Sequence, residues 1–249
     1  MASSPTSRQR LRFPEKAVCL CALLFTTVTA KSEEPPPVAT FSIVAVDPDT
    51  GEIGVAVQSK IVGVGSIVPF AKAGVGAIAT QSFANTGYGP LGLLALQSDL
   101  DPDQTIKLLT ENDPLHPSRQ VAVISANGEA ATFTGDNCHG WAGGLTGENY
   151  AVQGNILTGP EVVKAMAKAF EEAEGVLAER LIASLAAGQE AGGDKRGRQS
   201  ASLLIVRESW GYGGIDDRFR DVRVDDHATP IAELERVYRL HRELFPRPE

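Results

Sequence analysis

The sequence is poor in cysteine, methionine and tryptophan: its 249 residues include three Cys, two Met and two Trp. Cys19 and Cys21 lie in the first 30 residues, so a chain that loses this segment keeps only Cys138 and cannot form an internal disulfide. Hydrophobic side chains make up 43% of the chain, which at this length is enough for a packed core without disulfides or structural metals. Packing must therefore supply the stability.

Positive charge and aromatic side chains are also scarce. Lys and Arg number 23 against 31 Asp and Glu, which gives a net charge of −8 and argues against a nucleic-acid partner, because phosphate contacts require a basic face. Aromatic residues make up 6%, too few for an extended platform that stacks sugars or bases. The sequence contains no HExxH, CxxC or Walker motif, so it predicts neither a metal nor a cofactor.

The N-terminal segment is basic and then apolar. Arg8, Arg10, Arg12 and Lys16 precede the run Ala17–Ala30, which ends in small residues. This pattern is typical of a secretory signal, whereas a membrane span needs about 20 apolar residues. We therefore expect an exported protein, periplasmic or extracellular, without a stable membrane anchor. An uncleaved anchor is the alternative.

Two cleavage sites are compatible with the sequence. Cleavage after Ala30 makes 1–30 the signal and leaves the proline-rich segment 31–39 as a linker or propeptide. Cleavage after Ala39 extends the signal to 1–39 and makes Thr40 the first residue. Without residues 1–30 the chain keeps 19 bases and 30 acids, a balance of −11. One domain is expected over 40–249.

Within that domain, alternating apolar residues predict strands in hairpins, and apolar residues at helical spacing predict helices in pairs. An Asn-Gly pair at 127–128 marks one hairpin turn, Asp101 with Gln104 marks one helix start, and Thr158 with Pro160 another. These patterns favour an α+β fold of antiparallel sheets layered with helices over a doubly wound parallel sheet. Strands are expected over 40–47, 51–60, 67–80, 120–125, 129–135, 150–155, 200–207 and 219–225, and helices over 90–97, 102–111, 162–170, 176–185 and 230–244.

Thr40 is the first candidate for chemistry, because it opens the first expected strand beside one of the two cleavage sites. A threonine at a free N-terminus has its own α-amine beside its hydroxyl. That amine has an ordinary pKa of about 7.7–8.0, so its neutral form can accept the hydroxyl proton near neutral pH. Ser42 is a less favoured candidate for the same role. From spacing alone, an ordinary edge-strand threonine is the more common explanation of Thr40.

Two polar segments, Gln81–Gly89 and Gln153–Asn155, each follow a β run. Side-chain amides at such positions can donate hydrogen bonds to a developing oxyanion, and Asn155 is the candidate for that role. Gln81 and Asn85 are candidates for binding substrate. The alternative is that these amides satisfy loop backbone groups.

A basic segment interrupts the otherwise acidic chain at 192–201 (GGDKRGRQSA). Lys195, Arg196 and Arg198 could hold an anionic substrate, with Asp194 orienting one of the arginines. Lys60 is the last residue of the second expected strand and could lower the pKa of a Thr40 amine by repulsion between like charges. Solvated side chains are the alternative for all of these residues.

Two further groups are weaker candidates. Cys138 beside His139 is a poor nucleophile–base pair, because adjacent side chains on a strand point to opposite faces. His227 with Asp225 and Asp226 resembles a metal corner, but the histidines lack the spacing of a known site.

Four long blocks resemble the family known as domain of unknown function 1028, which is assigned by fold to the N-terminal-nucleophile hydrolases. The blocks are ATFSIVAVDPDTGEIGVAVQSK, GVGAIATQSFANTGYGPLGL, AVQGNILTGPEV and AAGQEAGGDKRGRQSASLLIV. The resemblance covers nearly all of the chain after Thr40. It implies a four-layer αββα sandwich of two antiparallel sheets, and amide hydrolysis by an N-terminal residue that matches Thr40.

The sequence therefore predicts an exported hydrolase of C–N bonds that acts on a small, anionic amide or peptide-like substrate through Thr40. The alternative is a non-catalytic protein that binds a ligand on the same scaffold. A homo-oligomer is compatible with either.

Overall fold

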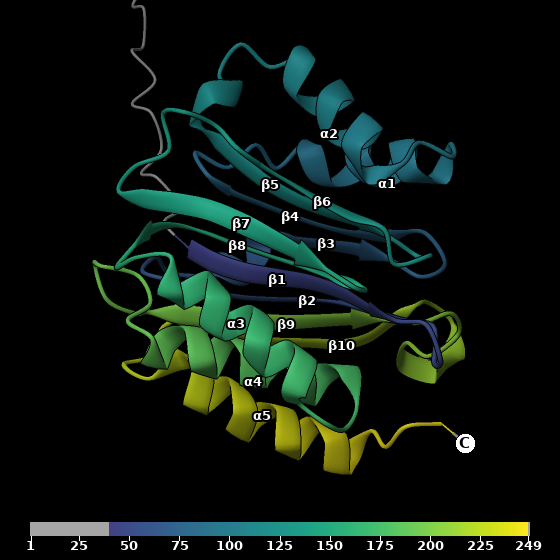
Figure 1. The fold of residues 1–249 in the computed structure, drawn as a ribbon. Helices are drawn as coiled ribbons and strands as arrows, with labels where there is room; N and C mark the ends of the chain where they lie inside the picture. Colours follow the sequence, from purple (N-terminus) through teal and green to yellow (C-terminus); the bar gives the residue numbers. More distant parts are fainter. Residues whose placement is uncertain (1–39, 249) are drawn as a thin grey trace, which may run out of the picture. The chain divides into compact units, whose positions relative to one another are not determined.

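The computed structural model describes residues 40–248, in which two antiparallel sheets pack face to face between layers of helices (Figure 1). The expected four-layer αββα architecture is thus confirmed. The expected signal at 1–30 and linker at 31–39 lie outside the described residues. Within 40–248, no helix has both the length and the apolar character needed to cross a membrane.

The larger sheet has six strands in the order β10-β9-β2-β1-β8-β7. The predicted first hairpin is confirmed, with Thr40 paired to Ser59, and the other edge of β1 pairs Phe41 with Gly154. β7 was not predicted, since its glycine-rich sequence shows no alternation of apolar and polar residues. The strands are β1 (Thr40–Asp47), β2 (Glu52–Ser59), β7 (Trp141–Gly147), β8 (Tyr150–Leu157), β9 (Ser200–Val206) and β10 (Arg218–Val224).

The smaller sheet has four strands in the order β3-β4-β5-β6. The single β region expected over 67–80 is instead two strands separated by a turn at Gly74, whose φ of 68° favours glycine. The strands are β3 (Pro69–Lys72), β4 (Gly76–Ser82), β5 (Arg119–Ser125) and β6 (Ala130–Thr134), and short 3₁₀ helices lie at Val64–Ser66, His116–Ser118 and Tyr212–Gly214.

Two helices cover the smaller sheet and three cover the larger one (Figure 1). The capping box predicted at Asp101 and Gln104 is confirmed, whereas the cap predicted at Thr158 is wrong: α3 begins after Pro160 without a side-chain cap. The helices are α1 (Tyr88–Gln97), α2 (Pro102–Glu111), α3 (Glu161–Glu172), α4 (Leu177–Glu190) and α5 (Pro230–Leu244).

Alternation along β1 assigns its side chains to two layers. Phe41 and Ile43 pack against the helices of the larger sheet, whereas Val44 and Val46 belong to the apolar core between the sheets. Thr40 and Ser42 share the face of Val44. The inter-sheet layer therefore becomes polar toward the start of β1.

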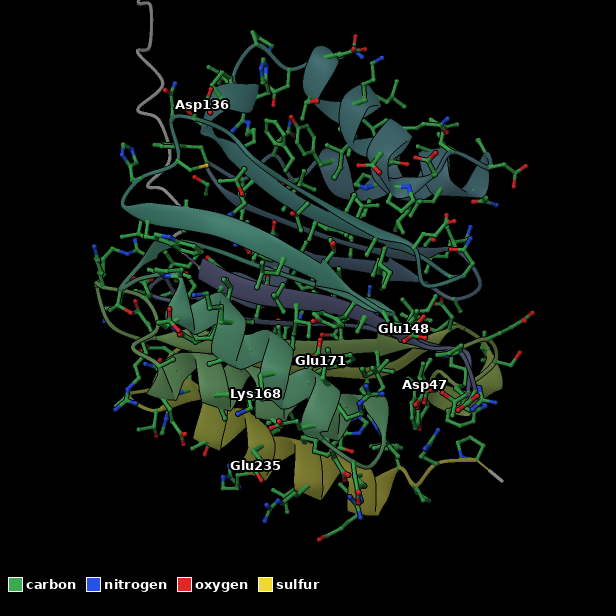
Figure 2. All side chains as sticks on the ribbon, in the orientation of Figure 1. Asp47, Asp136, Glu148, Lys168, Glu171 and Glu235 are labelled. Atoms are coloured by element: carbon green, nitrogen blue, oxygen red, sulfur yellow. The ribbon has the colours of Figure 1, made fainter. Side chains whose placement is uncertain are left out.

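The two ends of the sheets are used below as landmarks. Figure 2 shows Asp136 at one end and Asp47 with Glu148 at the other. We call the first the Thr40 end, because Thr40 pairs with Ser59 there, and the second the Glu52 end, because Asp47 pairs with Glu52 there.

Candidate functional site

Thr40 is fully buried at the head of the central strand β1. Its hydroxyl donates a hydrogen bond to Ser59 Oγ at 3.1 Å, and its carbonyl oxygen accepts one from Gln81 Nε2 at 3.3 Å. Continuing the pairing of Phe41 with Gly154 by one residue sets Asn155 opposite Thr40. The fold thus brings together three residues that the sequence had singled out: Thr40, Gln81 and Asn155.

Five fully buried polar side chains fill the inter-sheet layer beside Thr40. Gln120 on β5 lies at their centre: its Nε2 donates to the Gly154 carbonyl at 2.8 Å and to Thr134 Oγ1 at 2.9 Å. We call the group the amide network: Ser42, Gln81, Gln120, Gln153 and Asn155.

Backbone carbonyls fix the direction of the three glutamine amides in the network, because a carbonyl can only accept. Gln120 Nε2 must be the donor to the Gly154 carbonyl, so Gln120 Oε1 must accept. It accepts from Gln81 Nε2 at 2.8 Å and from Asn155 Nδ2 at 2.9 Å. Gln153 Nε2 is fixed in the same way by the Ala79 carbonyl, at 2.9 Å.

Ser42 connects the two halves of the network. Its hydroxyl donates to Gln81 Oε1 at 2.7 Å and accepts from Gln153 Nε2 at 3.3 Å. Two acceptors remain without a donor among the described residues, namely Gln153 Oε1 and Asn155 Oδ1. A buried acceptor without a donor costs about 1–3 kcal/mol. The network is therefore suited to receive an N–H group.

Strained backbone follows two of the network amides. Ser82, directly after Gln81, has a φ of 67°, and Ile156, directly after Asn155, has a φ of 52°. Positive φ is a true outlier for a β-branched residue such as Ile, and strain of this kind gathers at functional sites. At Ile156 it is accommodated by a hydrogen bond from its N–H to the His139 carbonyl, at 2.9 Å.

The basic segment borders the same end of the sheets. The Lys195 N–H donates to the Ile156 carbonyl at 3.0 Å, next to Asn155. Asp194 is buried, and the expectation that it orients an arginine is confirmed: its Oδ2 accepts from Arg196 Nη2 at 2.9 Å. Arg196 is thus held by an internal carboxylate, whereas the Lys195 side chain is exposed.

Lys60 and Arg198 occupy the rim rather than the buried network. Lys60 is exposed directly after Ser59, and the stem of its side chain passes near Gly197. Arg198 lines a cavity of about 240 Å³ between α4 and the start of α5, together with Gln189. Arg198 therefore faces the helical layer of the larger sheet.

Asn85 belongs to a second polar cluster, at the start of α1. Its Nδ2 donates to Asp113 Oδ2 at 3.0 Å, and Tyr88 and Arg119 donate to the same oxygen at 2.9 Å and 2.8 Å. Burial opposes ionisation of Asp113, but hydrogen bonds from Arg119 and Asn85 outweigh it and hold its pKa far below the ordinary value. The cluster fixes the connection between β4 and α1.

The weaker candidates are not activated by their surroundings. Burial raises the pKa of the Cys138 thiol, which donates a hydrogen bond to the Arg119 carbonyl, so the thiol form is favoured. His227 Nδ1 accepts from the Thr229 N–H at 3.0 Å. Over residues 40–248, no group of three or more His, Cys, Asp or Glu side chains is placed to hold a metal ion.

Ser59 and Gln120 were not predicted from the sequence. Ser42 was only the less favoured alternative to Thr40, and Gln153 was named only as part of a polar segment. Gln81 lies just past the strand expected over 67–80 but is inside β4, whereas Gln153 and Asn155 lie inside β8, in agreement with the strand expected over 150–155. One sequence signal was available: Ser42, Gln81 and Gln120 are polar residues at inward positions of otherwise apolar strands.

Comparison with known proteins places these features in a family. The model of the family described as "Family of unknown function (DUF1028)" matches residues 40–234, so the match begins at Thr40. No curated protein matches the chain significantly.

The solved structures that match the chain include the following two. Protein SPO2555 from Silicibacter pomeroyi, described as a DUF1028 protein, is 31% identical, with a TM-score of 0.76 over 82% of this chain and 86% of that one. Anbu (ancestral beta-subunit) from Yersinia bercovieri is 11% identical, with a TM-score of 0.35 over 84% of this chain and 98% of that one.

Proposed function

The chain belongs to the DUF1028 family, and from this premise we propose that it is an exported amide hydrolase whose nucleophile is Thr40, exposed by cleavage after Ala39. The observation that carries the proposal is the position of Thr40. It lies at the head of the central strand, beside the amide network. Its hydroxyl donates a hydrogen bond to Ser59, and its carbonyl accepts one from Gln81. The family match begins at the same residue.

In the proposed reaction, the neutral α-amine of the processed chain accepts the proton of the Thr40 hydroxyl. The hydroxyl oxygen attacks the carbonyl carbon of the substrate and an oxyanion forms. The C–N bond then breaks, the leaving amine takes the proton from the α-ammonium, and an ester on Thr40 remains. Water hydrolyses this ester and restores the hydroxyl.

Asn155 has two roles in this scheme. Its unpaired Oδ1, opposite Thr40 in the strand register, accepts a hydrogen bond from the α-amine. Its Nδ2 donates one hydrogen to Gln120 and keeps the second for the oxyanion. Gln120 holds this orientation, because backbone carbonyls fix its own amide.

The basic rim favours an anionic substrate. Lys60 and Lys195 are exposed at the Thr40 end, and Arg196 remains partly exposed while paired with Asp194. Lys60 also supplies a like charge on the residue next to Ser59, which would lower the pKa of the α-amine. Arg198 and Asn85 face other parts of the molecule, so we do not include them in the substrate contacts.

The test is covalent labelling of secreted protein with a β-lactone probe, with the adduct mapped by mass spectrometry. We expect the label on Thr40 and a loss of labelling of at least 100-fold in Thr40→Ala, with partial retention in Thr40→Ser. Thr86→Ala, which changes an exposed threonine, is the matched control and should label normally. Equal labelling of Thr40→Ala would remove Thr40 from the mechanism.

The burial of Thr40 favours a second candidate, a non-catalytic ligand-binding protein on the same scaffold. In that case the chain before Thr40 stays attached, no probe labels Thr40, and a bound ligand is released unchanged.

A further inference from the structure

Arg220 is among the largest fully buried side chains of the structure, with an exposed fraction of 2%. It lies on the edge strand β10, on the helical side of the larger sheet. Removing a guanidinium from water is costly unless hydrogen bonds and an opposite charge compensate for it. The contacts of Arg220 therefore show whether its charge is compensated.

All of these contacts are with neutral groups. Arg220 Nη1 donates to His241 Nδ1 at 2.8 Å and to the Phe245 carbonyl at 2.6 Å, and the guanidinium carbon lies 3.8 Å from the centre of the Phe219 ring. His241 must be neutral to accept at Nδ1; burial, and then the charge of Arg220, lower its pKa in agreement with this. Among residues 40–248 no carboxylate forms an ion pair with Arg220.

Arg220 lines a cavity of about 370 Å³ at the Glu52 end of the sheet. Two other arginines line it, but each has a carboxylate of its own. Arg247 Nη2 lies 3.1 Å from Glu52 Oε2, and Arg242 pairs with Glu179. Arg220 therefore has no ion-pair partner of its own among the described residues, and Glu52 attracts its charge only from a greater distance.

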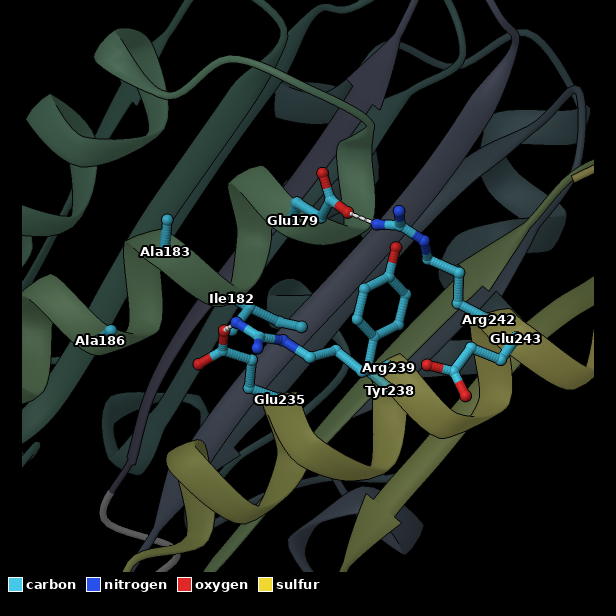
Figure 3. Close-up of a pocket in the computed structure, with 9 residues that line it drawn as sticks. All are labelled: Glu179, Ile182, Ala183, Ala186, Glu235, Tyr238, Arg239, Arg242 and Glu243. Carbon is cyan, nitrogen blue, oxygen red and sulfur yellow. Dashed lines mark hydrogen bonds and ion pairs between the residues drawn. The ribbon is translucent and has the colours of Figure 1, made fainter. Parts of the chain in front are cut away.

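The other walls are apolar and the rim is ordered. Figure 3 shows the Glu179–Arg242 ion pair above the Tyr238 ring, and these three residues line both the cavity and a neighbouring groove of about 560 Å³ between α4 and α5. A cavity of this size and composition is typical of small-molecule sites. Its apolar lining comprises Val176, Ala178, Ile205, Phe219 and Pro246.

We propose that this cavity binds a small monoanionic carboxylate with an apolar body, whose carboxylate pairs with the Arg220 guanidinium. Neither Nε nor Nη2 of Arg220 donates to another described residue, so two donors are available to the carboxylate. The apolar walls contact the body of the ligand. Because Arg247 and Arg242 are each paired with a carboxylate, the cavity has one positive charge left for a ligand, which favours a monoanion over phosphate or a dicarboxylate.

This site is separate from the one proposed around Thr40. Thr40 pairs with Ser59 at one end of the β1–β2 hairpin, whereas Glu52 pairs with Asp47 at the other. At about 3.3 Å per residue, the length of the strand places the two sites about 20 Å apart. The carboxylate site therefore does not depend on catalysis by Thr40.

The test uses hexanoate as the probe, with neutral hexanamide and inorganic phosphate as comparison ligands, by isothermal titration calorimetry at constant ionic strength. We expect saturable binding of hexanoate, and binding at least tenfold weaker for both hexanamide and phosphate. Arg220→Met should weaken hexanoate binding at least tenfold. Arg236→Met is the matched control, since it removes an exposed arginine of α5 and should bind normally.

A second variant tests the cavity independently, in case Arg220→Met does not fold. Val176→Phe adds bulk to the cavity wall without changing any charge, and it should abolish hexanoate binding while circular dichroism stays unchanged. Absence of hexanoate binding to the unmodified protein would overturn the proposal. So would equal binding by folded Arg220→Met, or a preference for phosphate or hexanamide over hexanoate.

Discussion

Replacing Gln120 by methionine tests the amide network directly, because methionine has a similar volume but cannot replace the amide's hydrogen bonds. The change removes donated bonds to Thr134, Gly143 and Gly154 and accepted bonds from Gln81 and Asn155. Gln81 Nε2 keeps its hydrogen bond to the Thr40 carbonyl, but Asn155 Nδ2 loses its hydrogen-bond partner. One or two buried polar groups are then left without partners.

Each such group costs about 1–3 kcal/mol, so the free energy of unfolding should fall by about 1–6 kcal/mol. For a domain of this size, at about 2–4 °C for each kcal/mol, that corresponds to a decrease in Tm of roughly 2–25 °C. Urea unfolding followed by far-UV circular dichroism measures the change. Gln97→Met is the control, because Gln97 is an exposed residue bonded to Lys72, and its effect should stay within about 0.5 kcal/mol. A loss below about 1 kcal/mol for Gln120→Met would refute the account of the network.

Two further predictions concern titratable groups. Because burial and Arg220 lower the pKa of His241 below 6.5, the unfolded chain protonates first, so stability is full above pH 6.5 and decreases as the pH falls below it. His241→Gln should flatten that decrease in urea midpoints measured between pH 7.5 and 5.5, and an unchanged pH profile would contradict the assignment. Asp113→Asn removes the charge that Arg119 faces, so we expect a loss of about 3 kcal/mol at pH 7 in urea unfolding. Since the pKa of Asp113 is lowered, the gap between wild type and variant should narrow as the pH falls below 3.8, and a gap that does not depend on pH would point to packing instead.

Strong local patterns made most of the fold predictable from the sequence. Alternation in TFSIVAVD and GEIGVAVQ indicated the first hairpin, and Asp101 with Gln104 indicated the start of α2. β7 was not predicted because three of its seven residues are glycine, so its sequence has no strand pattern. It is an edge strand that is defined by its pairing with β8.

The candidate site was predictable only in part, because its chemistry depends on register. Thr40 and Asn155 stood out by their neighbours in the sequence. Gln120, in contrast, is a single polar residue near the start of a predicted strand, and only the pairing of Gln81 with Gln120 brings it into the network. The burial of Arg220 could not be predicted for the same reason. The sequence RFRDVRV has the alternation of an exposed edge strand, and Arg220 is buried only because α5 and the residues after it pack over β10.

The most direct test of the proposed function is the intact mass of the secreted, catalytically active protein, combined with sequencing of its first residues. The account predicts that active material begins at Thr40 and that acetylating its α-amine abolishes amide hydrolysis. Active protein that still carries Lys31–Ala39 ahead of Thr40 would contradict it, because the nucleophile would then lack the amine that serves as its base.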